Sequence, residues 1–343
     1  MGSNNVNKIY IITHNDLDGM GGAASILRIL GKKLNDSVII FAEPYNVENA
    51  IEGIIDSVNK GDYLFLVDIG SNKNNISYVY NYFKEISKKG VEIYWFDHHV
   101  WEDKDIQLIK SIGVNVIVDT STCGTGVAIK YASKIFEKNI DDFLEKLEKA
   151  ICASDIWKWD DELGAKLFRA TYANGGLNGL EWKFKVIDKF INGIIWDEEL
   201  EEHLRYYIRK ELEGYDRILS TLKTYGNSCK VSGVFKDTDI PSDSIVGAMI
   251  LSRSNSDIAV IIKKKGFNLV SLSLRSRDKA NVQLIAKSLG GGGHPKASGA
   301  SMNIPLYVSL ISLFDKSFLI KYVIKNIYSL ALNNNSCLLN KKN

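Results

Sequence analysis

Short apolar runs alternate with longer amphipathic stretches over the first part of the chain. The apolar runs cover residues 9–13, 38–42, 63–67, 91–96 and 114–118, and stretches with helical spacing lie between them. Runs of about five β-branched and aromatic residues are typical of strands buried on both faces of a parallel sheet. The alternation therefore predicts an α/β domain whose parallel sheet carries helices on both faces.

The pattern changes in the second part of the chain. Residues 200–222 place leucine and isoleucine on one stripe with charged residues opposite, which predicts an amphipathic connector helix. Short β-type runs then occupy 231–235, 258–262 and 269–274, with helical stretches near 244–251 and 282–289. This texture predicts a second, smaller α+β domain.

Two further stretches complete the expected organisation. The pattern is irregular over 182–195, and 306–332 predicts one core-packing helix, because its charged residues exclude a membrane span. The predicted divisions are a catalytic domain 1–195, a connector helix 196–226, a substrate-binding domain 227–332 and a disordered tail 333–343.

Composition narrows the class of protein. A chain of 343 residues is long enough for two hydrophobic cores, and 45% hydrophobic with 24% charged residues is ordinary for a globular protein. The formal charge of +2, from 43 basic and 41 acidic residues, argues against a protein that grips long nucleic acid through many phosphates. Short or small anionic substrates are compatible with this net charge.

The cysteines and the first residues of the chain indicate the cellular compartment of the protein. The four cysteines are scattered, so neither a disulfide framework nor a thiolate zinc site is expected. Residues 1–9 are polar and lack the apolar segment of a secretory signal. A cytoplasmic protein without a membrane segment is the prediction.

Polar residues cluster where predicted elements end. Asp97, His98 and His99 directly follow the 91–96 run, and carboxyl ends of parallel strands form the ligand crevice of open α/β sheets. Three adjacent polar residues alone would most simply be a strand-to-loop turn. Further acids and one histidine stand at other element ends, however, and complete a set of six N and O donors: His14, Asp16, Asp18, Asp68, His98 and Asp155.

This donor set indicates a metal. Carboxylates and imidazoles without thiolates suit Mn²⁺ or Mg²⁺, and six donors are natural for two ions that share a bridging carboxylate. Another histidine, His203, lies on a charged helical stretch and is predicted to be solvated surface.

The second domain holds candidate substrate contacts. Gly290 to Gly293 form four glycines in a row before His294, whereas a helix C-cap needs only one. We expect a loop that lies against a ligand, with His294 available for a phosphate or a base. Arg275 and Arg277 follow the 269–274 run, and guanidinium groups suit phosphate oxygens, although an exposed arginine pair alone is more often solvated.

Taken in order, these motifs resemble the DHH phosphoesterase superfamily with its associated C-terminal domain. They are His14-x-Asp16-x-Asp18-Gly19, Asp68 after an apolar run, Asp97-His98-His99, Asp155 after a helix, and Gly290 to His294. The resemblance covers nearly the whole chain. One departure is that His14 precedes the first acid by two residues, whereas many members place this histidine four residues before it.

The resemblance implies a hydrolase of phosphodiester or phosphomonoester bonds that uses two Mn²⁺ or Mg²⁺ ions between two domains. It implies that the six donors bind metal, with Asp68 bridging, and that Asp97 supports its strand end. The implied catalytic residues are Asp68, Asp97, His98 and His99. The implied substrate contacts are His99, Arg275, Arg277, Gly291, Gly292, Gly293 and His294.

The motifs and the length are most similar to the compact nanoRNase group. The pyrophosphatase, long exonuclease and membrane-bound phosphodiesterase branches differ in their C-terminal domain, length or N-terminal segments. The predicted function is hydrolysis of very short single-stranded oligonucleotides or dinucleotides to mononucleotides. A 3′,5′-bisphosphonucleotide phosphatase, a soluble dinucleotide phosphodiesterase and a non-catalytic nucleotide sensor are the alternatives, and a homodimer is left open.

Overall fold

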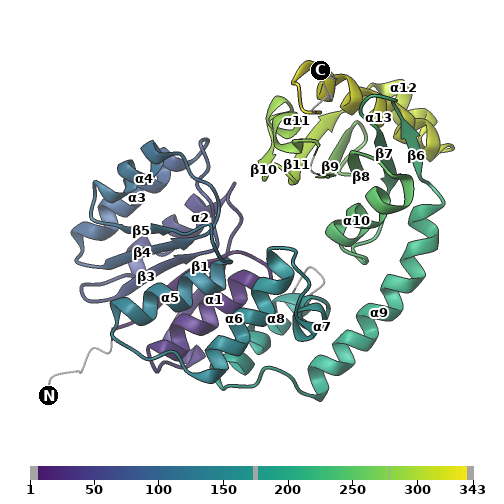
Figure 1. Cartoon of the computed structure of the whole chain (residues 1–343). Coiled ribbons are helices and arrows are strands. Elements are labelled where there is room, and N and C mark those ends of the chain that lie inside the picture. The colour runs from purple at the N-terminus through teal and green to yellow at the C-terminus, as the bar shows by residue number, and fades with distance from the viewer. Residues whose placement is uncertain (1–6, 173–176, 278, 338–343) are drawn as a thin grey trace, which may run out of the picture. The chain divides into compact units, whose positions relative to one another are not determined.

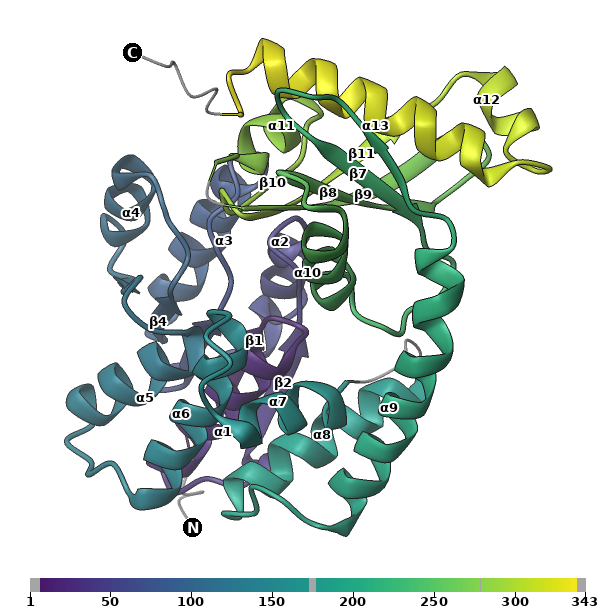
Figure 2. The same cartoon turned by 45° about the vertical axis from the view of Figure 1, so that its right-hand side comes forward.

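The chain is described by a computed structural model that covers residues 7–172, 177–277 and 279–337 (Figures 1 and 2). It divides into two compact units, Met1–Arg205 and Tyr206–Asn343. Each unit is built on its own sheet, with hydrophobic cores of its own on the two faces.

The first unit contains a five-stranded parallel sheet in the order β2-β1-β3-β4-β5. Ile9 of the interior strand β1 pairs with Ser37 of β2 on one side and with Tyr63 of β3 on the other. The strands are β1 (Ile9–Thr13), β2 (Ser37–Phe41), β3 (Tyr63–Val67), β4 (Glu92–Asp97) and β5 (Asn115–Val118). The parallel sheet predicted from the apolar runs is confirmed.

Alternate residues of these strands enter two different cores, one on each face of the sheet. Ile11, Phe65 and Phe96 pack against one helical layer, formed by α1 (Leu17–Ile29), α5 (Gly124–Ile135), α6 (Asp142–Asp155), α7 (Glu162–Ala170) and α8 (Leu177–Ile191). Leu66 and Trp95 pack against the opposite layer, formed by α2 (Val47–Glu52), α3 (Ile76–Lys88) and α4 (Asp103–Lys110) (Figure 1). Two 3₁₀ turns, Leu34–Asp36 and Ile55–Ser57, complete the unit.

The second unit contains a six-stranded sheet in the order β10-β11-β9-β8-β7-β6. Only β7 and β8 pair in parallel; the other pairs are antiparallel. The strands are β6 (Lys223–Tyr225), β7 (Val231–Phe235), β8 (Ile258–Lys264), β9 (Leu269–Ser276), β10 (Gly292–Gly293) and β11 (Ala297–Asn303). This mixed sheet agrees with the predicted α+β class.

Helices cover both faces of the second sheet. The helix α10 (Asp243–Ser254) packs on one face, and α11 (Val282–Ser288) and α13 (Lys316–Asn333) pack on the other. The short helix α12 (Leu306–Ile311) precedes α13. The predicted connector is the long helix α9 (Glu198–Leu219), which begins in the first unit and ends in the second.

A buried charge cluster lies inside the second unit. The Asp243 carboxylate is 2.5 Å from Lys236 Nζ and 2.9 Å from Lys263 Nζ, and it accepts a hydrogen bond from the Ser273 hydroxyl. Burial alone would raise the pKa of Asp243, but the two ammonium groups lower it to about 2. The Asp243 carboxylate therefore stays ionised beside the two lysines.

Three expectations from the sequence are wrong. Residues 182–191 are not irregular but helical, because α8 runs to Ile191 and buries Trp182, Val186 and Phe190 at a spacing of four; the irregular part is 192–195. The stretch 306–332 is two helices, because Asp315 breaks it and caps α13 by accepting the Ser317 N–H.

The cysteines are the third correction, because all four are paired, as Cys123–Cys152 and Cys229–Cys337. The partners are 29 and 108 residues apart, so their pairing depends on tertiary packing that spacing does not reveal. Of the expected tail 333–343, residues 338–343 lie outside the described residues. No helix in the described part of the chain is long and apolar enough to span a membrane.

Candidate metal centre

The sequence-predicted donors meet at one edge of the first sheet. His14 directly follows β1, Asp68 directly follows β3, and His98 directly follows β4. Because these strands are parallel, their carboxyl ends lie on the same edge. The other donors, Asp16, Asp18 and Asp155, come from the start of α1 and the end of α6.

Asp68 lies at the middle of this arrangement. Its backbone has a φ of +59°, a left-handed conformation that costs about 1–3 kcal/mol in a non-glycine residue and is concentrated at functional sites. Its Oδ1 atom is 3.3 Å from Nε2 of His98, and its Oδ2 atom is 3.5 Å from Nδ1 of His14. The two oxygens of one carboxylate therefore face two different imidazoles.

Three overlapping groups of donor atoms result, each with its atoms within 4.8 Å of one another. The groups are His14, Asp16 and Asp68; Asp68, His98 and His99; and Asp18, His98 and Asp155. All six predicted metal ligands are thus brought together, and His99 lies beside them.

His14 joins this cluster despite its unusual spacing. Its Nδ1 atom is 2.8 Å from Oδ2 of Asp16, and its Nε2 atom is 3.2 Å from Oε2 of Glu43. The sequence analysis missed Glu43. Its position two residues after β2, at the same edge of the sheet, is the signal that could have identified it.

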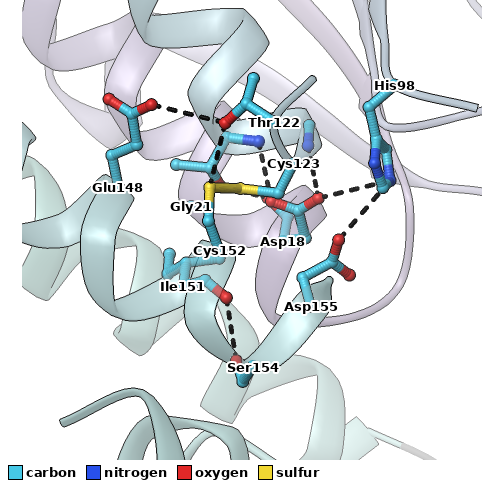
Figure 3. Close-up of a disulfide and its surroundings, with 12 residues drawn as sticks. Asp18, Gly21, His98, Thr122, Cys123, Glu148, Ile151, Cys152, Ser154 and Asp155 are labelled. Atoms are coloured by element: carbon cyan, nitrogen blue, oxygen red, sulfur yellow. Dashed lines mark hydrogen bonds and ion pairs between the residues drawn. A yellow bond between two sulfur atoms is a disulfide. The ribbon is translucent and has the colours of Figure 1, made fainter. Parts of the chain in front are cut away.

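Asp18 is buried in the first turn of α1 and is held by the start of α5 (Figure 3). Its carboxylate accepts hydrogen bonds from the backbone N–H groups of Gly124, at 2.6 Å, and Thr125, at 2.7 Å. A Cβ atom on Gly124 would lie 2.7 Å from Asp68 Cβ, so glycine permits this approach. Burial and the neighbouring Asp68 carboxylate raise the pKa of Asp18 to about 7.

Asp155 brings a carboxylate from the far end of α6. Its Oδ2 atom is 3.6 Å from Nε2 of His98, yet it is buried and has no hydrogen-bond partner within the described residues. Burial and the charges of Asp18 and Asp68 raise the pKa of Asp155 well above its usual value. A buried, unsatisfied oxygen among like charges calls for a cation.

His98 responds to the same charges. Burial alone would lower its pKa, but a hydrogen bond to Asp68 and the charges of Asp18 and Asp155 raise the pKa of His98 to about 10. The surroundings thus favour positive charge. Carboxylate and imidazole donors without thiolates suit Mn²⁺ or Mg²⁺, so the residues present fit divalent cations.

Asp97 and His99 form a supporting pair. The fully buried Asp97 carboxylate is 2.8 Å from Nδ1 of His99 and accepts a hydrogen bond of 2.6 Å from the Trp101 indole. Burial alone would raise the pKa of Asp97, but the His99 charge and these contacts lower it. Trp101 was missed by the sequence analysis.

Apart from His99, the predicted substrate contacts lie in the second unit, where both arginines already make hydrogen bonds. The Arg275 guanidinium donates to the Ser244 hydroxyl at 2.8 Å and to the Leu274 carbonyl at 3.0 Å. Arg277 donates to the Asn255 side chain and to the Leu251 carbonyl. Both arginines are therefore oriented by the unit itself.

Internal structure explains most of the glycine run. Gly290 has a φ of +76° at the end of α11, and Gly291 and Gly293 press against the backbone of β11. An added Cβ at Gly292 would meet nothing within 4 Å. His294 follows, and its backbone N–H donates a hydrogen bond to the Ala297 carbonyl. A chain reversal and close strand pairing thus account for three of the four glycines.

His203 differs from its prediction as solvated surface. Its ring stacks on Trp182 with centroids 3.5 Å apart and planes within 3°, and burial lowers its pKa. The prediction was wrong because it considered only the charged neighbours of His203 along α9.

The fold and the site define a protein with an α/β unit and an α+β unit, and with a candidate metal centre of carboxylates and imidazoles on the first. Residues 8–154 match the DHH family, N-terminal domain, and residues 228–316 match the DHHA1 domain. Two consecutive segments of the chain therefore match the DHH and DHHA1 family models, in that order. The predicted resemblance is confirmed at this level, and membership of the nanoRNase group stays a prediction.

Solved structures share this fold at low sequence identity. The pGpG-specific phosphodiesterase PggH from Vibrio cholerae has a TM-score of 0.55 and 15% identity, over 94% of this chain and 99% of that one. RecJ in complex with Mn²⁺ from Thermus thermophilus has a TM-score of 0.58 and 14% identity, over 96% of this chain and 52% of that one. An exopolyphosphatase-related protein from Bacteroides fragilis has a TM-score of 0.52 and 16% identity, over 94% of both chains.

Among proteins with curated descriptions, none matches the sequence.

Proposed function

We propose that this protein is a phosphoesterase that uses two divalent ions to hydrolyse very short oligonucleotides from one end. The observation that carries the proposal is the position of Asp68, whose two oxygens face His98 and His14 in separate donor groups. A carboxylate placed in this way suits a bridge between two ions. His14 and Asp16 would serve one ion; Asp18, His98 and Asp155 would serve the other.

The surrounding residues support phosphoryl chemistry. Bound ions would supply Lewis-acid polarisation of the phosphoryl group and activation of a water. Asp97 orients the His99 ring through Nδ1, which would place an imidazole beside the donor groups to stabilise charge on a phosphoryl oxygen. The Gly124 and Thr125 amides hold the Asp18 carboxylate in place by donating hydrogen bonds to it.

An aromatic turn beside the metal centre supports a substrate with a nucleobase. Trp157 lies two residues after Asp155, is 40% exposed and has a φ of +62°. Its ring meets Trp159 edge to face at 4.8 Å, and Trp159 packs on Phe168 at 5.5 Å. A supported, exposed indole is a stacking platform for a base.

The near-neutral charge favours a short substrate over a long one. Two proteins of the same fold are named for such substrates or for nuclease activity, the pGpG-specific phosphodiesterase PggH and the exonuclease RecJ. A linear dinucleotide such as pGpG belongs to the substrate class proposed here.

We assign the predicted substrate contacts of the second unit to the same activity. Arg275 would bind a substrate phosphate, with Arg277, Gly291, Gly292, Gly293 and His294 as further contacts. Arg275→Ala should raise KM and also lower kcat, because a misplaced phosphate misses in-line attack. The measurement is kcat/KM against substrate length from dimer to 24-mer, and a profile identical to that of the parent would refute the assignment.

One experiment tests the proposal. Metal-free protein is titrated with Mn²⁺ to count the ions, then incubated with a 5′-labelled dimer, pentamer and 24-mer, a 3′,5′-bisphosphonucleotide and a cyclic dinucleotide. We expect two ions per chain and the highest kcat/KM on the dimer or pentamer. A higher kcat/KM on the bisphosphonucleotide or on the cyclic dinucleotide would make that compound the proposed substrate. Nucleotide binding without turnover would identify a sensor.

A further inference from the structure

A disulfide joins two helix ends beside the proposed metal centre (Figure 3). Cys123 is the N-cap residue of α5, Cys152 lies three residues before the end of α6, and their Cα atoms are 5.2 Å apart. Cys123 is fully buried, and Cys152 is 9% exposed. The bond therefore sets the spacing of these two helix ends covalently.

One side of this bond supports Asp18. The residues that follow Cys123, Gly124 and Thr125, donate their backbone N–H groups to the Asp18 carboxylate at 2.6 and 2.7 Å. The Thr125 hydroxyl also donates to the Asp18 backbone carbonyl at 2.8 Å. The position of Asp18 therefore depends on where the first turn of α5 is held.

The other side of the bond supports Asp155. The backbone N–H of Ile156 donates to the Cys152 carbonyl at 3.1 Å, which closes the helical turn that contains Asp155. The Asp155 Oδ2 atom has no hydrogen bond of its own within the described residues, although it lies 3.6 Å from His98. Its position is therefore set by the end of α6, where Cys152 is anchored.

We propose that the Cys123–Cys152 disulfide positions Asp18 and Asp155 for a divalent cation, so that its reduction weakens cation binding. The inference rests on the proposed function, because it requires the metal centre. A dithiol reductant supplies two electrons and two protons: a sulfur–sulfur bond forms in the reductant, the Cys123–Cys152 bond breaks, and both cysteines become thiols.

Reduction should weaken cation binding because metal sites tolerate only small changes in the positions of their ligands. Ligand distances in a working site hold to within about 0.2 Å, and loss of a group that orients a ligand costs about 10–100-fold in affinity. Once the bond is broken, α5 and α6 are held together by packing and by a long hydrogen bond of 3.5 Å from the Thr122 hydroxyl, just before α5, to Glu148 of α6. The proposal thus makes the metal centre respond to the thiol–disulfide state of its surroundings.

The second disulfide supplies a matched control. Cys229 and Cys337 are bonded within the second unit, in a different hydrophobic core, with Cα atoms 6.0 Å apart. The double variant Cys229→Ala/Cys337→Ala removes this bond and leaves Cys123–Cys152 intact. Reduction of that variant therefore acts on the proposed bond alone.

The experiment measures Mn²⁺ affinity of the full chain from the electron paramagnetic resonance signal of free Mn²⁺. Parent, Cys229→Ala/Cys337→Ala and Cys123→Ala/Cys152→Ala are each compared before and after treatment with dithiothreitol, which is removed anaerobically before titration. Far-UV circular dichroism of every sample monitors the fold.

Reduction should weaken Mn²⁺ binding at least tenfold in the parent and in Cys229→Ala/Cys337→Ala. Cys123→Ala/Cys152→Ala should bind as weakly as the reduced parent in both states. Affinities within twofold before and after reduction of the parent, or parental affinity in Cys123→Ala/Cys152→Ala, would overturn this inference and leave the proposed function standing. An oxidised parent that binds no Mn²⁺ would overturn both.

Discussion

Substitution of Gly124 by alanine tests how the metal centre is assembled. Its added Cβ would lie 2.7 Å from Asp68 Cβ and 3.0 Å from Asp18 Oδ2, whereas ordinary contact begins at 3.4 Å. Asp68 or the first turn of α5 must therefore move by about 0.7 Å, several times the roughly 0.2 Å that metal–ligand distances tolerate. The same movement lengthens the hydrogen bonds that hold Asp18.

We expect Gly124→Ala to weaken Mn²⁺ binding by about 10–100-fold, which corresponds to about 1.4–2.8 kcal/mol. Overpacking at this buried position should also lower the free energy of unfolding by about 1–3 kcal/mol. Isothermal titration calorimetry with Mn²⁺ and urea unfolding of the metal-free protein measure the two effects separately.

Gly53→Ala is the matched control in the same unit. Gly53 has a φ of −62° at the end of α2, and an added Cβ meets only the Asn49 carbonyl at 3.4 Å and the Ala50 carbonyl at 3.7 Å. This variant should keep parental affinity. If Gly124→Ala binds Mn²⁺ within threefold of the parent, the close approach of α5 does not position the ligands and the reasoning is refuted.

Three further predictions follow from the same contacts. Asp68→Ala should lower turnover in Mn²⁺ at least 100-fold with little loss of stability, because a bridging ligand is lost while carboxylate repulsion is relieved; activity within tenfold of the parent would contradict bridging. Trp157→Ala should raise KM for a dinucleotide about tenfold and Trp157→Phe should restore it, since stacking needs only an aromatic ring. Because the pKa of Asp243 is lowered in the folded state, its contribution is fully present above about pH 4 and is lost as pH falls through 2. This contribution is worth about 2 kcal/mol. Urea unfolding from pH 5 to 2 should show the fall in the parent but not in Asp243→Asn, which leaves the Lys236 ammonium buried without its partner.

The pattern of apolar and polar residues was sufficient to predict the fold class and to select the donors that the structure brings together. Five apolar runs correspond to the five strands of the first sheet, because strands of a sheet covered by helices on both faces are mostly apolar. Donors placed at strand ends, such as Asp68 and His98, come together because parallel strands end on one edge of the sheet. Local periodicity contains this information.

Only the tertiary structure decided what surrounds these donors. Asp18 is held by Gly124 and Thr125, more than 100 residues away, and no local pattern indicates which helix start will meet it. The pairing of Cys123 with Cys152 likewise depends on two helices packing side by side. Periodicity reports which face of an element is buried; the partner on that face is chosen by packing between elements distant in the chain.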